Sequence, residues 1–182
     1  AQVWINERER DGELGVDDDQ NGYIDDLLGW DFTHAPGFAG LGDFLERDSN
    51  PMDESGHGTH VAGIIGASAN NGAGIAGVAS GVRIMPLRAG FNLATGGFLE
   101  DDDLAAAIVY AVDNGADILN MSWGDPQFSP LIRDVIRYAE SRGTILVAAA
   151  GNDGKDEVFY PAKLDETIAV GASGSGDVIP GF

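Results

Sequence analysis

Residues 101–122 read DDDLAAAIVYAVDNGADILNMS, and this stretch decides the class of fold that the sequence predicts. Leu104, Ile108 and Val112 recur at helical spacing, which predicts a helix over residues 101–114. Three aspartates place negative charge on its first turn, where the helix dipole favours it, and Gly115 supplies the stop. The short apolar run that follows, residues 117–122, is typical of a buried strand.

The same alternation continues on both sides of this stretch. Further strands are predicted for the short apolar runs at 82–87, 144–149 and 167–170. Helices are expected over residues 58–65 and from Pro130, behind the N-cap Ser129, to about residue 142. Apolar strands alternating with helices predict an α/β fold, with a mostly parallel β-sheet and helices on both faces.

Polar or glycine-rich segments follow two of the predicted strands. Ser122-Trp123-Gly124 lies at the end of one strand, and residues 151–154, Gly-Asn-Asp-Gly, follow another. Ligands of open parallel sheets bind beyond the carboxyl ends of the strands. The functional site is therefore expected at these two segments.

The chain is strongly acidic: its 182 residues include 30 Asp and Glu against 10 Lys and Arg, for a formal net charge of −20. Nucleic acids and anionic membrane surfaces attract cationic proteins, so the sequence predicts neither as a partner. No apolar run approaches the ~20 residues of a membrane span. The absence of cysteine excludes disulfides, thiolate metal sites and a cysteine nucleophile.

Composition divides the chain into two regions. Residues 1–55 are acidic, polar and punctuated by glycine, so we expect them to be rich in loops. Residues 56–182 carry the alternating helices and strands of an α/β core. The length by itself suits one domain, because a domain typically has roughly 100–200 residues.

The strongest local motif is Ser55-Gly56-His57-Gly58-Thr59-His60-Val61-Ala62-Gly63. A histidine between two glycines at the start of a helix has an accessible ring and can act as a general base. Two other interpretations stay open: a structural histidine at a helix start, and a metal site shared with His60 on the same helical face. The motif lacks the glutamate of the HExxH pattern and shows no third ligand, which disfavours the metal site.

This motif resembles the histidine motif of the subtilisin-like serine proteases, the subtilases. Three further segments agree with that family in order: residues 75–79 (IAGVA), 117–124 (DILNMSWG) and 147–154 (VAAAGNDG). The resemblance covers about residues 22–182 and implies a three-layer subtilisin-like fold, incomplete at both ends. It also implies a secreted serine endopeptidase whose partner is a polypeptide substrate and which is a monomer when intact.

The resemblance implies roles for individual residues. His57 would be the general base, and Asn152 would donate its side-chain amide to the oxyanion of the tetrahedral intermediate. Ala150 and Gly151 would leave room for a substrate side chain. An extended substrate would be flanked by Gly97, Phe98, Ser122, Trp123 and Gly124. Taken alone, Asn152 is a turn residue and Trp123 and Phe98 are ordinary packing residues, so these alternatives stay open.

The family also requires an aspartate that orients the histidine and a serine nucleophile, and the sequence has neither motif. It contains no Asp-Ser-Gly, Asp-Thr-Gly or Gly-Thr-Ser. Asp31, in GWDF, is the nearest match to the aspartate, but the resemblance places this stretch after the catalytic residue. We therefore expect residues 1–182 to be a central segment that is inactive by itself. A degenerate module that binds calcium or peptides without catalysis is the alternative.

Residues 17–26, DDDQNGYIDD, place oxygen-bearing side chains at alternate positions around a glycine. This is the beginning of the D-x-[DN]-x-[DN]-G calcium pattern, and similar loops occur in calcium-binding subtilases. The predicted ligands of a structural calcium ion are Asp17, Asp19, Asn21, the carbonyl of Tyr23, and Asp25 or Asp26. A solvated acidic loop without metal is the alternative. Weaker calcium candidates are residues 48–53 and 70–72.

Overall fold

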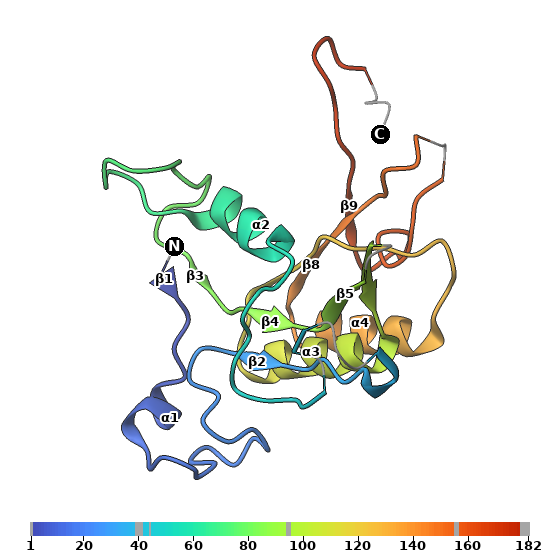
Figure 1. The fold of residues 1–182 in the computed structure, drawn as a ribbon. Helices are drawn as coiled ribbons and strands as arrows, with labels where there is room; N and C mark the ends of the chain where they lie inside the picture. The colour runs from blue at the N-terminus through green and yellow to red at the C-terminus, as the bar shows by residue number, and fades with distance from the viewer. Residues whose placement is uncertain (1, 39–41, 44, 94–95, 155–156, 179–182) are drawn as a thin grey trace. The chain divides into compact units, whose positions relative to one another are not determined.

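The structure, a computed structural model, describes residues 2–38, 42–43, 45–93, 96–154 and 157–178 (Figure 1). Helices and short parallel strands follow one another along the chain, as expected for the predicted α/β class. The chain divides into two compact units, Ala1–Ala107 and Ile108–Phe182. Within the described residues, no helix is both long enough and apolar enough to span a bilayer.

Two pairs of very short parallel strands organise the first unit. Strand β1 (Gln2–Val3) pairs with β3 (Arg83–Ile84), and β2 (Trp30–Asp31) pairs with β4 (Leu87–Arg88). The prediction of one continuous strand over 82–87 is wrong, because β3 and β4 are separate. Pro86 lies between them, and proline has no N–H to donate to a strand ladder.

An antiparallel hairpin follows in the first unit. Strands β5 (Gly90–Leu93) and β6 (Gly96–Leu99) pair with Phe91 opposite Phe98. The Phe91 ring is buried and lies 6.0 Å from the Phe98 ring and 5.2 Å from the Phe38 ring, measured between centroids. Phe38 ends the 3₁₀ helix η1 (Pro36–Phe38). The hairpin was not predicted, because its glycines weaken the alternating pattern of a strand.

The acidic N-terminal region, which was expected to be rich in loops, also contains a short α-helix, α1 (Glu7–Asp11). Asn6 is its N-cap, since the Asn6 side chain accepts a hydrogen bond from the Arg8 N–H. Residues 12–29 after the helix are irregular, as predicted for this region.

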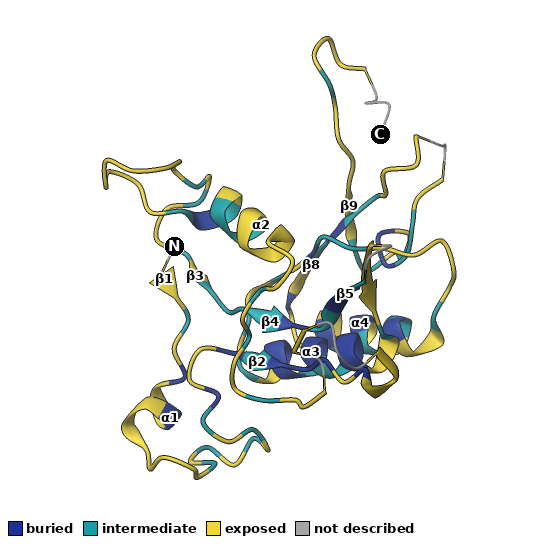
Figure 2. Cartoon of the chain, in the orientation of Figure 1, coloured by how far each residue is buried: buried dark blue, intermediate teal, exposed yellow. Residues whose placement is uncertain are grey.

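Helix α2 (His57–Gly66) confirms the helix that was predicted over residues 58–65. Most of its residues are exposed or half-buried (Figure 2). Its last turn is tied to the following chain by two backbone hydrogen bonds, from Val78 to Ile64 and from Ala79 to Ile65. The helix therefore has a fixed C-terminal end even though it buries few large side chains.

A parallel three-stranded sheet forms the second unit. Its order is β7 (Ile118–Met121), β8 (Ile145–Ala149) and β9 (Ile168–Val170), which confirms the three strands that were predicted there. Leu146 and Ala148 of β8 are buried, on the face opposite to the exposed Ile145. Helix α4 (Pro130–Ser141) packs against β8.

The two longest helices start and stop where the sequence predicted. Helix α3 (Asp101–Asp113) ends before Gly115, which adopts a left-handed φ of 78°. Helix α4 begins behind Ser129, whose hydroxyl accepts a hydrogen bond from the Ile132 N–H at 3.3 Å. Figure 2 shows that these two helices carry much of the buried surface.

The buried face of α4 provides a test of core packing in the second unit. Ile136 is fully buried, so I136A should lower the free energy of unfolding by about 2–5 kcal/mol, because the truncation leaves a cavity. Leu131 lies on the same helix but is 44% exposed, and L131A serves as the matched control with a much smaller effect. Urea denaturation measures both changes; equal losses would contradict the packing described for α4.

Candidate functional site

His57 is the first residue of α2, and its side chain is exposed. Among the residues that the structure describes, none forms a hydrogen bond or ion pair with the His57 imidazole. The described residues also provide no metal cluster that includes His57 and His60. The His57 imidazole is therefore accessible at the start of α2.

The Asp53 carboxylate holds the backbone at the start of α2. Its Oδ1 accepts hydrogen bonds from the N–H groups of Ser55 and Gly56, both at 2.8 Å. Its Oδ2 accepts from the N–H and the hydroxyl of Thr59, both at 2.7 Å. Desolvation by burial raises the pKa of Asp53, but these hydrogen bonds together outweigh it and lower the pKa to about 2.

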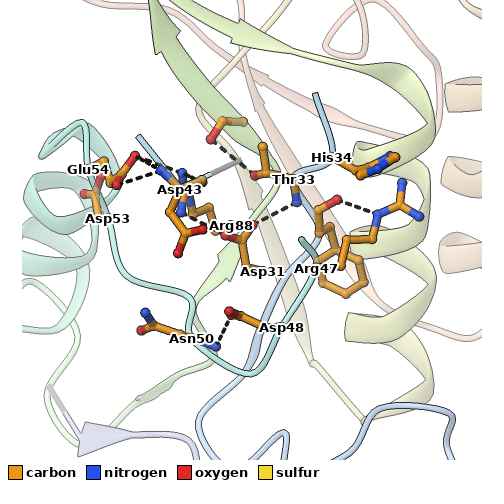
Figure 3. A network of polar contacts seen from close by, with 12 residues as sticks. Asp31, Thr33, His34, Asp43, Arg47, Asp48, Asn50, Asp53, Glu54 and Arg88 are labelled. Atoms are coloured by element: carbon orange, nitrogen blue, oxygen red, sulfur yellow. Dashed lines mark hydrogen bonds and ion pairs between the residues drawn. The ribbon is translucent and has the colours of Figure 1, made fainter. Parts of the chain in front are cut away.

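Asp31 forms a buried ion pair with Arg88 across the β2–β4 pair (Figure 3). Arg88 Nη1 donates to Asp31 Oδ2 at 2.8 Å, and the Thr33 N–H donates to Oδ1 at 2.8 Å. Burial raises the pKa of Asp31 to about 6, although the bonds from Thr33 and the charge of Arg88 act to lower it. Since the raised pKa favours protonation in the folded state, ionisation of Asp31 costs stability as the pH rises towards 6.

Arg88 connects this ion pair to the loop that precedes His57. Its Nη2 lies 3.0 Å from Glu54 Oε2 and donates to the Asp43 carbonyl. Glu54 in turn accepts hydrogen bonds from the Asp43 N–H. Figure 3 shows Arg88 between Asp31 on one side and the loop carrying Asp43 and Glu54 on the other.

A second buried carboxylate lies nearby in the first unit. Asp103, in the first turn of α3, accepts a hydrogen bond from the His34 N–H at 3.0 Å and pairs with Arg47 at 2.6 Å. Arg47 also donates to the Phe32 carbonyl at 2.8 Å. Arg47 and Arg88 thus each tie a loop residue to a buried acid.

Asn152 lies in the exposed turn that follows β8, in the second unit. Among the described residues, none accepts a hydrogen bond from its side-chain amide. The preceding Gly151 has a left-handed φ of 108°, and a Cβ there would lie 3.1 Å from the Phe159 ring. The left-handed φ favours glycine at this position, and a larger residue would also press against the Phe159 ring.

The segment after β7 contacts the same aromatic residue. A Cβ at Gly124 would lie 3.1 Å from the Phe159 Cβ, and the Ser122 hydroxyl accepts a hydrogen bond from Asn120 at 2.9 Å. Trp123 is half-buried. The small residues at positions 124 and 151 therefore accommodate Phe159, a neighbour that the sequence did not indicate.

Gly97 and Phe98 lie on β6 in the first unit, and both are exposed. Phe98 is 41% exposed, and its ring stacks on the Phe91 ring. Phe98 therefore stabilises the hairpin by packing. Within the described residues, β6 pairs only with β5, so the other edge of β6 has backbone groups available for an added strand.

The acidic loop brings together a set of carboxylates that differs from the predicted one. Oxygen atoms of Glu9, Asp19 and Asp26 lie within 4.8 Å of one another. Glu9 comes from α1 and accepts hydrogen bonds from the N–H groups of Asp18, Asp19 and Asp25. No sequence signal joined Glu9 to the loop, because the contact depends on the fold of residues 12–26.

The other predicted ligands of this loop have different neighbours. The Asp17 carboxylate accepts from the N–H groups of Asn21 and Gly22, and Asp25 accepts from the Gly15 N–H. Asn21 donates through its amide to both Asp19 and Asp26, and its oxygen accepts from the Tyr23 N–H. The Tyr23 ring packs edge-on against Trp30 at 5.1 Å.

The weaker calcium candidates form tight local turns. Asp48 accepts a hydrogen bond from the Asn50 N–H at 2.8 Å, while Asp53 holds the start of α2 as described above. Asn71 accepts from the Ala73 N–H at 3.0 Å. The described residues show no cluster of three acidic or histidine ligands at either place.

Comparison with known proteins assigns this chain to one family. A model described as the subtilase family matches residues 42–182. The chain is 43% identical over 140 residues to the thermophilic serine proteinase of Bacillus sp. (strain AK1), covering 77% of this chain and 34% of that protein. It is 38% identical over 135 residues to thermitase of Thermoactinomyces vulgaris, covering 74% and 47%.

Solved structures agree. The S41 psychrophilic protease matches with a TM-score of 0.66 and 33% identity, covering 79% of this chain and 45% of that one. Sphericase matches with a TM-score of 0.64 and 36% identity, covering 79% and 46%. The chain thus spans less than half the length of each of these relatives.

The ion pair between Asp31 and Arg88 can be tested by a double-mutant cycle. R88M leaves Asp31 buried without its cation, so the free energy of unfolding should fall by about 3–5 kcal/mol. D31N/R88M removes the buried charge as well and should cost clearly less than the sum of the two single changes. Urea denaturation of the four proteins gives the coupling energy, and additive effects would contradict a direct pairing.

Proposed function

Because the chain belongs to the subtilase family, we propose that it forms the central part of a serine endopeptidase. The observation that carries this proposal is the family match over residues 42–182, which includes His57 at the exposed start of α2. Of the relatives named above, one is a serine proteinase by name and another is a protease by name. The proposed reaction is peptide-bond hydrolysis through an acyl-enzyme.

His57 is proposed as the general base. Its imidazole would take the proton of the attacking serine hydroxyl and return it to the leaving amine. An exposed ring at the first position of a helix, without a described partner, suits a group that must exchange protons with a substrate. Asn152 is proposed to stabilise the oxyanion through its exposed side-chain amide.

The serine and the aspartate of the triad are proposed to be contributed by parts of the protein outside residues 1–182. Both oxygens of Asp31 are engaged, by Arg88 and by Thr33, which supports a structural role for this residue. The sequence has no Gly-Thr-Ser motif for the nucleophile. Under this proposal, residues 1–182 alone have no peptidase activity.

The substrate is proposed to be a polypeptide bound in extended form. The edge of β6 that β5 does not use offers backbone N–H and C=O groups for an added strand, with Gly97 and Phe98 on it. Ser122, Trp123 and Gly124, together with Ala150 and Gly151, are proposed as further substrate contacts. We also propose that the protein is secreted and monomeric, as its family membership suggests.

The proposed role of His57 is tested in the protein that contains residues 1–182 with its flanking sequence. H57A should lower turnover of a peptide substrate by several orders of magnitude and abolish labelling by a serine-directed reagent, because the nucleophile loses its base. H60A, on the same helix, is the matched control and should keep most of the activity. A fully active H57A would contradict the role of His57 as the base, whereas an inactive wild type would favour the non-catalytic module.

We further propose that the acidic loop binds a structural calcium ion, with Glu9, Asp19 and Asp26 at its centre. Carboxylate oxygens are the ligands that calcium prefers, and three of them lie within 4.8 Å of one another here. Asp26 and Glu9 are buried, and neither Glu9 nor Asp19 forms an ion pair with a described residue. A divalent cation would offset the repulsion between these charges. The amides of Asn6 and Asn21 support the arrangement by donating to Asp19 and Asp26.

Calcium binding to this loop should raise the thermal unfolding midpoint. An ion at 100 times its dissociation constant stabilises the folded state by about 2.7 kcal/mol. D19N should reduce the calcium-dependent shift, whereas D11N, an exposed carboxylate on α1 that pairs with Arg10, should retain it. Scanning calorimetry with and without millimolar calcium measures the shift; an unchanged midpoint in the wild type would rule out the site.

A further inference from the structure

We propose that Asp53 is a positioning residue for His57 and that the Glu54–Arg88 ion pair holds Asp53 in place. The inference rests on the function proposed above, because it assigns Asp53 a role in the proton transfer carried out by His57. It follows from the contacts at the start of α2, which is otherwise poorly fixed.

The N-terminus of α2 has no ordinary cap. The N-cap residue is Gly56, which has no side chain to accept a hydrogen bond and adopts a left-handed φ of 80°. The first N–H groups of a helix have no partners within the helix, so an exposed end of this kind frays readily. A general base on the first residue of such a helix would change its position with each fraying event.

Asp53 replaces the missing cap from three residues upstream of Gly56. It accepts hydrogen bonds from Gly56, directly before His57, and from Thr59, two residues after it. The backbone of His57 is thus held on both sides by one carboxylate. Because the backbone is fixed on both sides of His57, the His57 side chain has a restricted range of positions.

Glu54 fixes Asp53 to the strands of the first unit. The Glu54 carboxylate lies 3.0 Å from Arg88 Nη2, and Arg88 is itself held by the buried Asp31. Asp53 therefore binds the start of α2, and the adjacent Glu54 binds Arg88 of the β2–β4 pair (Figure 3). Through Asp53 and Glu54, the position of His57 depends on the buried ion pair between Asp31 and Arg88.

A purely structural cap would stabilise the fold without changing the chemistry of folded molecules. A positioning residue changes the rate per folded active site, because small misplacements of a catalytic group slow proton transfer. The two roles are separated by measuring kcat and KM against the concentration of active sites, counted at the end point of labelling by a serine-directed reagent, which a slower labelling reaction still reaches.

The test uses the protein that contains residues 1–182 with its flanking sequence. D53A should lower kcat per active site by roughly ten- to a hundred-fold with KM within about two-fold of the wild type. D53N keeps one acceptor oxygen and should fall between D53A and the wild type. E54Q, which weakens the pairing with Arg88, should give a smaller loss of kcat in the same direction.

S129A is the matched control, because it removes the N-cap of α4, a helix without proposed catalytic residues. It should lower the unfolding midpoint but leave kcat per active site unchanged. If D53A behaves like S129A, with full kcat per active site, the positioning role is wrong while the proposed function stands. If the wild type has no peptidase activity, the proposed function itself fails and the inference fails with it.

Discussion

The buried ion pair between Asp31 and Arg88 is the interaction on which the first unit depends. Asp31 is fully buried and Arg88 nearly so, and loss of Arg88 would leave the Asp31 carboxylate buried without its cation. Their pairing joins β2 to β4, two strands far apart in sequence whose ladder is too short to be stable alone. Because Arg88 also reaches Glu54 and the Asp43 carbonyl, the same guanidinium fixes the loop that leads into α2.

The acidic residues of the first unit differ in what their carboxylates contact. A few carboxylates are satisfied by specific donors: Asp31 by Arg88, Asp103 by Arg47 and the His34 N–H, and Asp53 by the start of α2. Glu9, Asp19 and Asp26 instead lie close to one another, with amides and backbone N–H groups as donors. The net charge of −20 therefore combines structural acids, which organise loops, with solvated acids at the surface.

The elements that the sequence predicted correctly are those with a strong local pattern. Helices α3 and α4 combine apolar spacing with identifiable caps, and β7, β8 and β9 are short runs rich in branched apolar residues. The elements that it missed have little local signal. Helix α1 is short and strongly charged, the β5–β6 hairpin is rich in glycine, and β3 and β4 are separated at a proline. Strands β3 and β4 in addition pair with β1 and β2, which are distant in sequence.

The sequence by itself determined the α/β class, the family through the motif around His57, and the presence of an oxygen-rich loop at residues 17–26. These depend on residue type and spacing, which are local properties. Only the tertiary structure decided which side chains meet: Glu9 with Asp19 and Asp26, Arg88 with Asp31 and Glu54, and Phe159 with Gly124 and Gly151. Such pairings join residues up to 57 positions apart, and they form only when the packed chain brings buried charges and large rings to partners that can satisfy them.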